Sequence, residues 1–144
     1  MKSEAMDSIS ASFARQPLMA TLGARLLEVA DGLVRIELPI APAITQQHGF
    51  AHAGAIAAIA DSACGYAALT KMPAVSEVLS IEFKVNLLAP AAGERLIATA
   101  KVVRAGRTIS VCQAEVESLT GEARKLVAIM QATMIRAEAP APLP

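Results

Sequence analysis

The sequence predicts an α+β domain in which one long apolar helix is wrapped by a curved antiparallel β-sheet. Residues 53–70 are helix-forming and apolar on every side for more than two turns before an acid appears at Asp61. A helix without a polar face must be covered on all sides. A strand hairpin precedes this segment and four strand-like runs follow it, so a sheet is the natural cover.

Length and composition narrow the class further. A chain of 144 residues is expected to form a single domain, 1–144, with a substantial core. Apolar residues make up 54% of the chain but aromatic residues only 3%, so small and branched aliphatic side chains must fill that core. Thirteen basic and thirteen acidic residues cancel, which argues against a nucleic-acid or membrane-surface partner.

The cysteines and the N-terminus indicate a location. Cys64 and Cys112 do not make a disulfide framework and fit a reducing compartment. The first ten residues, MKSEAMDSIS, contain no apolar signal core, and apolar runs stay far below the roughly 18 residues of a membrane span. We therefore expect a soluble cytoplasmic protein.

The elements before the apolar helix follow from local patterns. Residues 4–15 predict a short helix, with Met6, Ile9 and Phe13 on one side. The stretch ARLLEVADGLVRIELPI predicts a hairpin around Asp31-Gly32, a strong two-residue turn sequence. Residues 41–52 hold a proline, a glycine, two glutamines and two histidines, and predict an irregular loop.

After the helix, four runs predict strands: VLSIEFKVNLL, RLIATAKVVR, TISVCQAEVES and RKLVAIMQATMIR. They are separated by Ala-Pro-Ala-Ala-Gly, Ala-Gly and Thr-Gly, which we interpret as hairpin connections of an antiparallel sheet. The final residues 137–144, AEAPAPLP, are expected to be a mobile tail, which leaves a core of about 17–136.

Asp61 is the candidate for chemistry, because an unpaired buried carboxylate costs several kcal/mol or becomes protonated. Either the helix surfaces there, with Ser62 or an arginine satisfying the acid, or Asp61 is a general base or nucleophile on a pocket wall. Gly54 and Gly65 are eleven residues apart and share one side of the helix. Their missing side chains either admit another backbone or relieve crowding.

The stretch QQHGFAHAGAIAAIADSACGYAA, with VLSIEFKVNLLAPA and VVRAGRT after it, resembles the hotdog-fold acyl-CoA thioesterases of the phenylacetate-pathway type. The resemblance covers roughly residues 17–136. The family motif is a loop ending in His-Gly-Gly, followed by a long helix with an acid nine residues after the histidine. His52 and Asp61 keep that spacing. The resemblance implies the hotdog fold and hydrolysis of acyl-CoA without a cofactor or metal.

The resemblance also implies roles for individual residues. The first motif glycine is Ala53 here, whose backbone N–H would be the oxyanion donor, while Gly54 keeps the second position. Gln46 stands where the family often has asparagine, and its longer side chain could still donate an amide hydrogen bond. Ser80 matches a position where relatives place a hydroxyl near the attacking water, although an ordinary strand serine is the alternative.

A thioester carbonyl placed at the helix N-terminus would meet unpaired N–H groups and a partial positive charge. Asp61 would then activate water, or attack the carbonyl to form a mixed anhydride. His52 and Asp61 are nine positions apart, roughly 13 Å along a helix, so they cannot reach one carbonyl carbon from the same chain. The mechanism therefore predicts a homodimer with shared sites, and the resemblance suggests a homotetramer.

Two histidines and a cysteine each have more than one possible role. His48 and His52 are four apart, but Gly49 disfavours a helix there and a third metal ligand is distant, so we expect no metal. His52 is either an acid–base group or a residue that orients the loop, and Cys64 is either a nucleophile or a packing residue.

Two further sets of residues are candidates for substrate binding. Arg104 and Arg107 flank a turn that lies near the CoA nucleotide in relatives, or they are simply solvated. Tyr66 belongs either to the core or to the substrate pocket. The predicted function is hydrolysis of an acyl- or aryl-CoA. A non-catalytic acyl-CoA-binding or assembly protein is the alternative, followed by a hydroxyacyl-thioester dehydratase, which would need a glutamate that this helix lacks.

Overall fold

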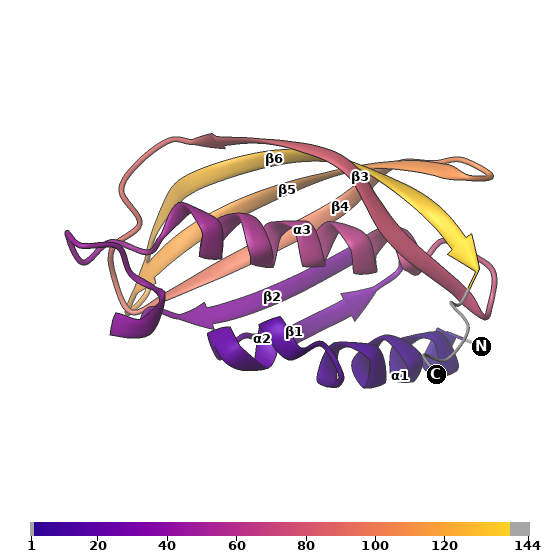
Figure 1. Ribbon diagram of the computed structural model, residues 1–144, viewed down its shortest axis with the longest axis horizontal. Coiled ribbons are helices and arrows are strands. Elements are labelled where there is room, and N and C mark those ends of the chain that lie inside the picture. Colours follow the sequence, from indigo (N-terminus) through magenta and orange to yellow (C-terminus); the bar gives the residue numbers. More distant parts are fainter. Residues whose placement is uncertain (1, 139–144) are drawn as a thin grey trace, which may run out of the picture.

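The computed structural model describes residues 2–138 and contains a six-stranded antiparallel sheet curved around one long helix (Figure 1). The predicted α+β class and wrapped helix are confirmed. The elements are α1 (Lys2–Ala14), α2 (Pro17–Leu22), β1 (Arg25–Ala30), β2 (Leu33–Pro39), a 3-10 turn η1 (Pro42–Ile44), α3 (Ala53–Leu69), β3 (Ser76–Leu87), β4 (Arg95–Ala105), β5 (Ile109–Thr120) and β6 (Ala123–Glu138).

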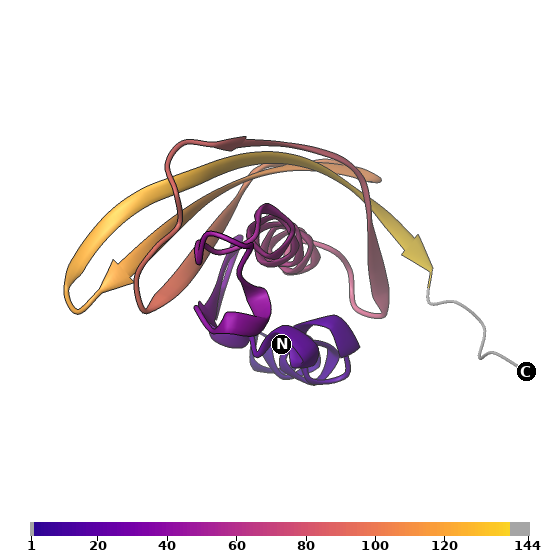
Figure 2. The same cartoon turned by 60° about the vertical axis from the view of Figure 1, so that its left-hand side comes forward.

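Helix α3 lies on the concave side of the sheet, and α1 and α2 lie on the same side, with α3 between them and the sheet (Figure 2). Ten of its residues are buried, and Ile59 and Ala60 are fully inaccessible. Its C-terminal end is fixed by Thr70, whose hydroxyl donates to the Ala67 carbonyl and accepts from the Gly32 N–H at 2.8 Å. Gly32 has φ +73°, the left-handed conformation that the β1–β2 turn requires.

The sheet order is β1-β2-β4-β5-β6-β3, so the predicted hairpin between β3 and β4 is wrong. β3 pairs with β6 at the edge of the sheet, and the segment 88–94 crosses to β4. On the way, the Leu88 N–H donates to Val127 on β6 and the Glu94 N–H donates to Leu119 on β5. Seven residues reach more than 20 Å when extended, and three strand spacings need only about 14 Å.

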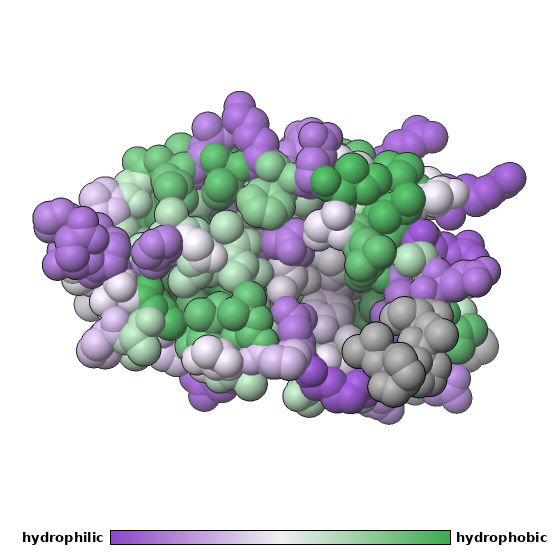
Figure 3. Space-filling view, in the orientation of Figure 1, coloured by the Kyte–Doolittle hydropathy of each residue, from purple (hydrophilic) through white to green (hydrophobic). Residues whose placement is uncertain are grey.

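The two edge strands differ in character. β1 has six residues and an irregular register, features that discourage further strand pairing. β3 has twelve residues and exposes large apolar side chains: Leu79, Ile81, Phe83 and Leu87. Figure 3 shows apolar surface gathered over β3. A long apolar edge with unpaired backbone groups is suited to pairing with another strand.

The described range ends inside the segment expected to be a tail. Ala137 and Glu138 still pair with β3, while residues 139–144 lie outside the described residues. None of the helices in residues 2–138 is both long and apolar enough to span a bilayer.

Candidate active site

The N-terminus of α3 leaves one backbone donor unused. His52 is the N-cap residue, and its Nδ1 accepts the Gly54 N–H at 2.7 Å. The N–H groups of Ala55 and Ile56 both donate to the His52 carbonyl. Within residues 2–138, the Ala53 N–H has no acceptor. An unpaired N–H at a helix N-terminus carries a partial positive charge, so it suits an oxygen that gains negative charge.

Gly54 is required by this cap. A Cβ on residue 54 would lie 3.0 Å from the His52 ring, so a side chain there would push the imidazole away from the N–H that it accepts. The other helix glycine is less constrained, because a Cβ on Gly65 would meet only the Val78 side chain at 3.7 Å. Crowding therefore explains the glycine at position 54, and no other backbone approaches Gly65 within the described residues.

The preceding loop is held by Gln46. Its side-chain oxygen accepts the His48 N–H at 2.6 Å and the Phe50 N–H at 3.3 Å. The Ala51 N–H then donates to the Ala91 carbonyl, which fixes the loop to the β3–β4 connection. The structure thus gives Gln46 a loop-holding contact through its oxygen, and its predicted amide donation to substrate stays a prediction.

Asp61 and Ser80 are brought together, although they lie 19 residues apart in the chain. The Ser80 hydroxyl donates to Asp61 Oδ1 at 2.7 Å and lies 3.4 Å from the Met134 sulfur. The register of β3 on β6 shifts between Ser80 and Glu82, so Ile81 is a bulge residue. Bulges re-aim neighbouring side chains, and this one keeps Ser80 opposite the buried Met134, on the side facing α3.

A cavity of about 260 Å³ opens beside this pair, between α3, β3 and the segment before α2. On the face in Figure 3, the surface is hollowed between the patch over β3 and the N-terminal helices. Tyr66 lines this cavity although it is 7% exposed, so it belongs to both core and pocket. The remaining lining residues are Ser12, Gln16, Asp61, Ser62, Gly65, Leu69, Glu77, Val78, Leu79, Ser80 and Met134.

One chain does not bring Ala53 and Asp61 together. Eight residues of one straight helix separate them, about 12 Å of rise. Arg104 and Arg107 are exposed near the β4–β5 turn, where the Thr108 carbonyl accepts the Arg136 N–H. β4 has eleven residues and begins beside the connection that contacts the α3 loop, so its far end lies about 30 Å further along the strand. The arginines and Ala53 therefore lie at opposite ends of the sheet.

Neither thiol suits nucleophilic chemistry. Cys64 and Cys112 are free and fully buried. Burial raises the pKa of Cys112 to about 11 and raises that of Cys64 further. Both thiols stay protonated near neutral pH, and the thiolate is the reactive form. Cys64 therefore serves packing. Within residues 2–138, no three His, Cys, Asp or Glu side chains are grouped as metal ligands.

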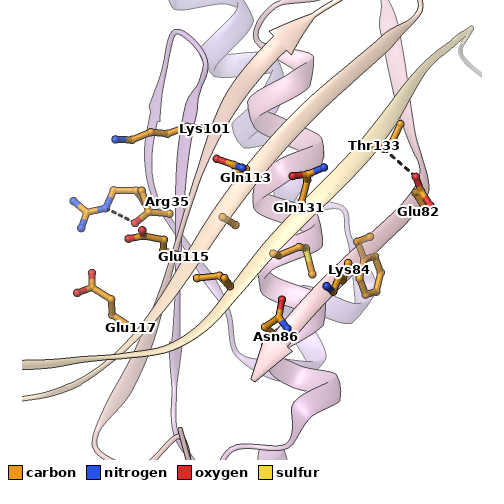
Figure 4. A pocket seen from close by; sticks show the side chains of 15 residues that line it. Arg35, Glu82, Lys84, Asn86, Lys101, Gln113, Glu115, Glu117, Gln131 and Thr133 are labelled. Carbon is orange, nitrogen blue, oxygen red and sulfur yellow. Dashed lines mark hydrogen bonds between the residues drawn. The ribbon is translucent and has the colours of Figure 1, made fainter. Parts of the chain in front are cut away.

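A larger cavity lies elsewhere. It measures about 770 Å³ and is lined by polar side chains on the face of the sheet turned away from α3 (Figure 4). Gln113 and Gln131 lie opposite each other at its centre, with Arg35 and Lys84 to either side. None of the predicted site residues lines it. The cavity beside Asp61 is therefore the candidate site, despite its smaller size.

Ser12, Gln16 and Ser62 are among the cavity residues that were not predicted as site residues. Ser12 and Gln16 precede the expected core, and Ser62 was considered only as a partner for Asp61. In the structure the Ser62 hydroxyl donates to Gln16 Oε1 at 3.0 Å instead. Polar residues in or just after a short N-terminal helix follow no periodic pattern that would identify them as site residues.

Comparison with known proteins identifies a family of similar sequences. Residues 48–124 match the sequence model of the Thioesterase superfamily. A protein named "Putative esterase" from Halobacterium salinarum is 34% identical over 104 residues, covering 69% of this chain and 68% of that protein.

Solved structures agree with the fold. The crystal structure of a thioesterase family protein from Silicibacter pomeroyi is 44% identical, with a TM-score of 0.91 over 94% of this chain and 99% of that one. The Escherichia coli PaaI protein from the phenylacetic acid degradation operon has a TM-score of 0.84 over 94% of this chain and 95% of that one. Its identity is 21%, so this second likeness concerns the fold alone.

The cap at His52 leads to a stability prediction. His52→Ala should lower the free energy of unfolding by about 1 kcal/mol, because the Gly54 N–H loses its acceptor. His52→Asn should stay within a few tenths of a kcal/mol of wild type, since asparagine is a good N-cap residue. Urea denaturation at one protein concentration measures both, with the exposed His48→Ala as control. Equal losses for Ala and Asn would show that capping is not the role of His52.

Proposed function

Since this chain belongs to the Thioesterase superfamily, we propose that it hydrolyses the thioester of an acyl- or aryl-CoA to the free acid and CoA. The observation that carries the proposal is the Asp61 carboxylate, held by the Ser80 hydroxyl at 2.7 Å on the wall of a cavity. The Ala53 N–H, which has no acceptor among the described residues, would supply the second group that such a reaction needs.

The thioester carbonyl oxygen accepts a hydrogen bond from the Ala53 N–H in this mechanism. Because no group of the same chain competes for that N–H within residues 2–138, the donor is preorganised. The partial charge at the α3 N-terminus adds to it, and both interactions strengthen as negative charge develops on the oxygen. Gly54, which has no side chain, leaves the approach to this donor open.

Asp61 then supplies the base or the nucleophile. As a base it takes a proton from water, whose oxygen attacks the carbonyl carbon, and the C–S bond breaks to release CoA thiolate. As a nucleophile it forms a mixed anhydride with loss of the thiolate, and water hydrolyses the anhydride. Ser80 occupies Oδ1, which leaves Oδ2 as the reacting oxygen and positions the carboxylate in either case.

Two copies of the chain complete each site. The β3 edge is long, apolar and unpaired within the described residues, so a second copy can add its own β3 there about a two-fold axis. Such an axis reverses the direction of α3 in the second copy. In this arrangement the Asp61 of the second copy approaches the Ala53 of this chain. The N–H and the carboxylate of one site then come from two different helices. A tetramer of two such dimers follows from the family resemblance.

The same axis accounts for the arginines. Arg104 and Arg107 lie at the end of the sheet opposite Ala53, and a two-fold operation exchanges the ends. The arginines of the second copy would therefore lie toward the Ala53 end, where guanidinium groups suit the phosphates of CoA. Tyr66 and Gly65 contribute to the acyl cavity beside Asp61. A cytoplasmic location stays part of the proposal.

The role of Asp61 gives the most direct kinetic prediction. Asp61→Asn should lower kcat by at least about 100-fold, because it removes the base and keeps the shape. Binding of a non-hydrolysable thioether analogue of acyl-CoA should persist within a few-fold. A panel of acyl-CoAs with a thiol reagent measures turnover, and Asp7→Asn, an exposed acid on α1, is the control.

Two outcomes would contradict this proposal. Near-normal turnover of folded Asp61→Asn would remove Asp61 from the mechanism. A wild-type protein that binds the analogue but hydrolyses no member of the panel would instead be an acyl-CoA-binding protein.

The arginines should act on binding rather than on chemistry. Arg104→Ala or Arg107→Ala should raise KM for acyl-CoA roughly tenfold with little change in kcat, because a phosphate contact is equal in ground and transition states. KM for acyl-pantetheine, which lacks the nucleotide, should not change. Arg124→Ala, an exposed arginine on β6, is the matched control. Equal effects on both substrates would exclude the phosphate contact.

A further inference from the structure

A chain of hydrogen bonds closes off part of the cavity beside Asp61. Gln16 Nε2 donates to the Tyr66 hydroxyl at 3.1 Å, and Gln16 Oε1 accepts from the Ser62 hydroxyl at 3.0 Å. The hydroxyls of Ser12 and Tyr66 share a further hydrogen bond at 3.1 Å. All four residues line the cavity. Both ends of the Gln16 amide are thus engaged by α3.

The segment that carries Gln16 is itself anchored in the core. Ile9 of α1 is 2% exposed and Met19 of α2 is 1% exposed, on either side of the junction where Gln16 stands. Phe13 lies against the Tyr66 ring, with centroids 6.1 Å apart. Gln16 is therefore fixed by its backbone as well as by its side chain, and it acts as a rigid wall.

The distance from the Asp61 carboxylate to Gln16 limits the length of the acyl group that fits between them. Tyr66 is five residues after Asp61 on α3, which is about 7.5 Å of rise. An acyl group whose carbonyl carbon lies at Asp61 and whose chain follows α3 toward Tyr66 meets the Gln16 amide there. A cavity of about 150 Å³ holds benzene, so 260 Å³ accommodates a group somewhat larger than one ring.

We infer that Gln16 is a specificity-determining residue that limits the acyl group to a single ring or a short chain. This inference rests on the proposed thioesterase function and adds its substrate class. Shortening residue 16 lengthens the cavity, whereas the Asp61–Ser80 pair stays intact because neither of its members bonds to Gln16. The change therefore alters acyl length preference without removing the catalytic groups.

The test is a graded series, wild type, Gln16→Asn and Gln16→Ala, measured as kcat/KM against straight-chain acyl-CoAs from acetyl to dodecanoyl and against ω-phenylalkanoyl-CoAs. Ser10→Ala, which changes an exposed serine on α1, is the control. The longest acyl group accepted should grow by about one carbon in Gln16→Asn and by about two or three in Gln16→Ala. For the first chain beyond the wild-type limit, kcat/KM should rise about fourfold, which corresponds to about 0.8 kcal/mol per buried methylene.

The outcomes separate the two proposals. An unchanged length profile, or an equal loss at all lengths, in folded Gln16 variants of an active protein would overturn the role of Gln16 alone. A wild-type protein that hydrolyses neither series, or that does so independently of Asp61, would overturn the thioesterase function itself. Gln16→Asn retains a side-chain amide, so the length profile of this variant still tests the role of Gln16 if Gln16→Ala does not fold.

Discussion

An α-helix is a rigid rod, and α3 carries at its first residue an N–H with no acceptor in residues 2–138, and a carboxylate eight residues later. About 12 Å of rise separates the two groups, and no rotation of a side chain closes that distance. If both groups act on one thioester, the site must be built from two chains. In the proposed dimer, the long apolar edge of β3 would supply the contact surface, and the exposed Ser80 on that strand would place the Asp61 carboxylate next to it.

The features that stabilise α3 are also those that form the site. His52 caps the helix and takes the Gly54 N–H, which leaves the Ala53 N–H as the free donor among the described residues. The bulge at Ile81 turns Ser80 toward Asp61. The segment before α2 contacts α3 through Gln16, which lines the cavity. The stability of α3 and the proposed chemistry thus involve the same contacts.

Periodicity and turn chemistry in the sequence were enough to predict the helix over 53–70 and the hairpin at Asp31-Gly32. They also identified Asp61 as the acid on an otherwise apolar helix. They could not predict that β3 pairs with β6, because turn residues show where strands end and not which strands become neighbours. The Gln16–Tyr66 contact joins residues 50 positions apart, and no local pattern encodes it. Likewise, the sequence could not show that the Gln46 oxygen holds the loop, since the contact depends on the loop's own fold.

Complementation between two inactive variants tests the shared site most directly. Ala53→Pro removes the N–H but suits the first helical position, and Asp61→Asn removes the base. When equal amounts are unfolded and refolded together, about half of the dimers are mixed, and in each of these one site is intact and the other carries both defects. Activity should return to about a quarter of wild type. A mixture that exchanges subunits yet stays as inactive as its parents would show that Ala53 and Asp61 do not act across two chains.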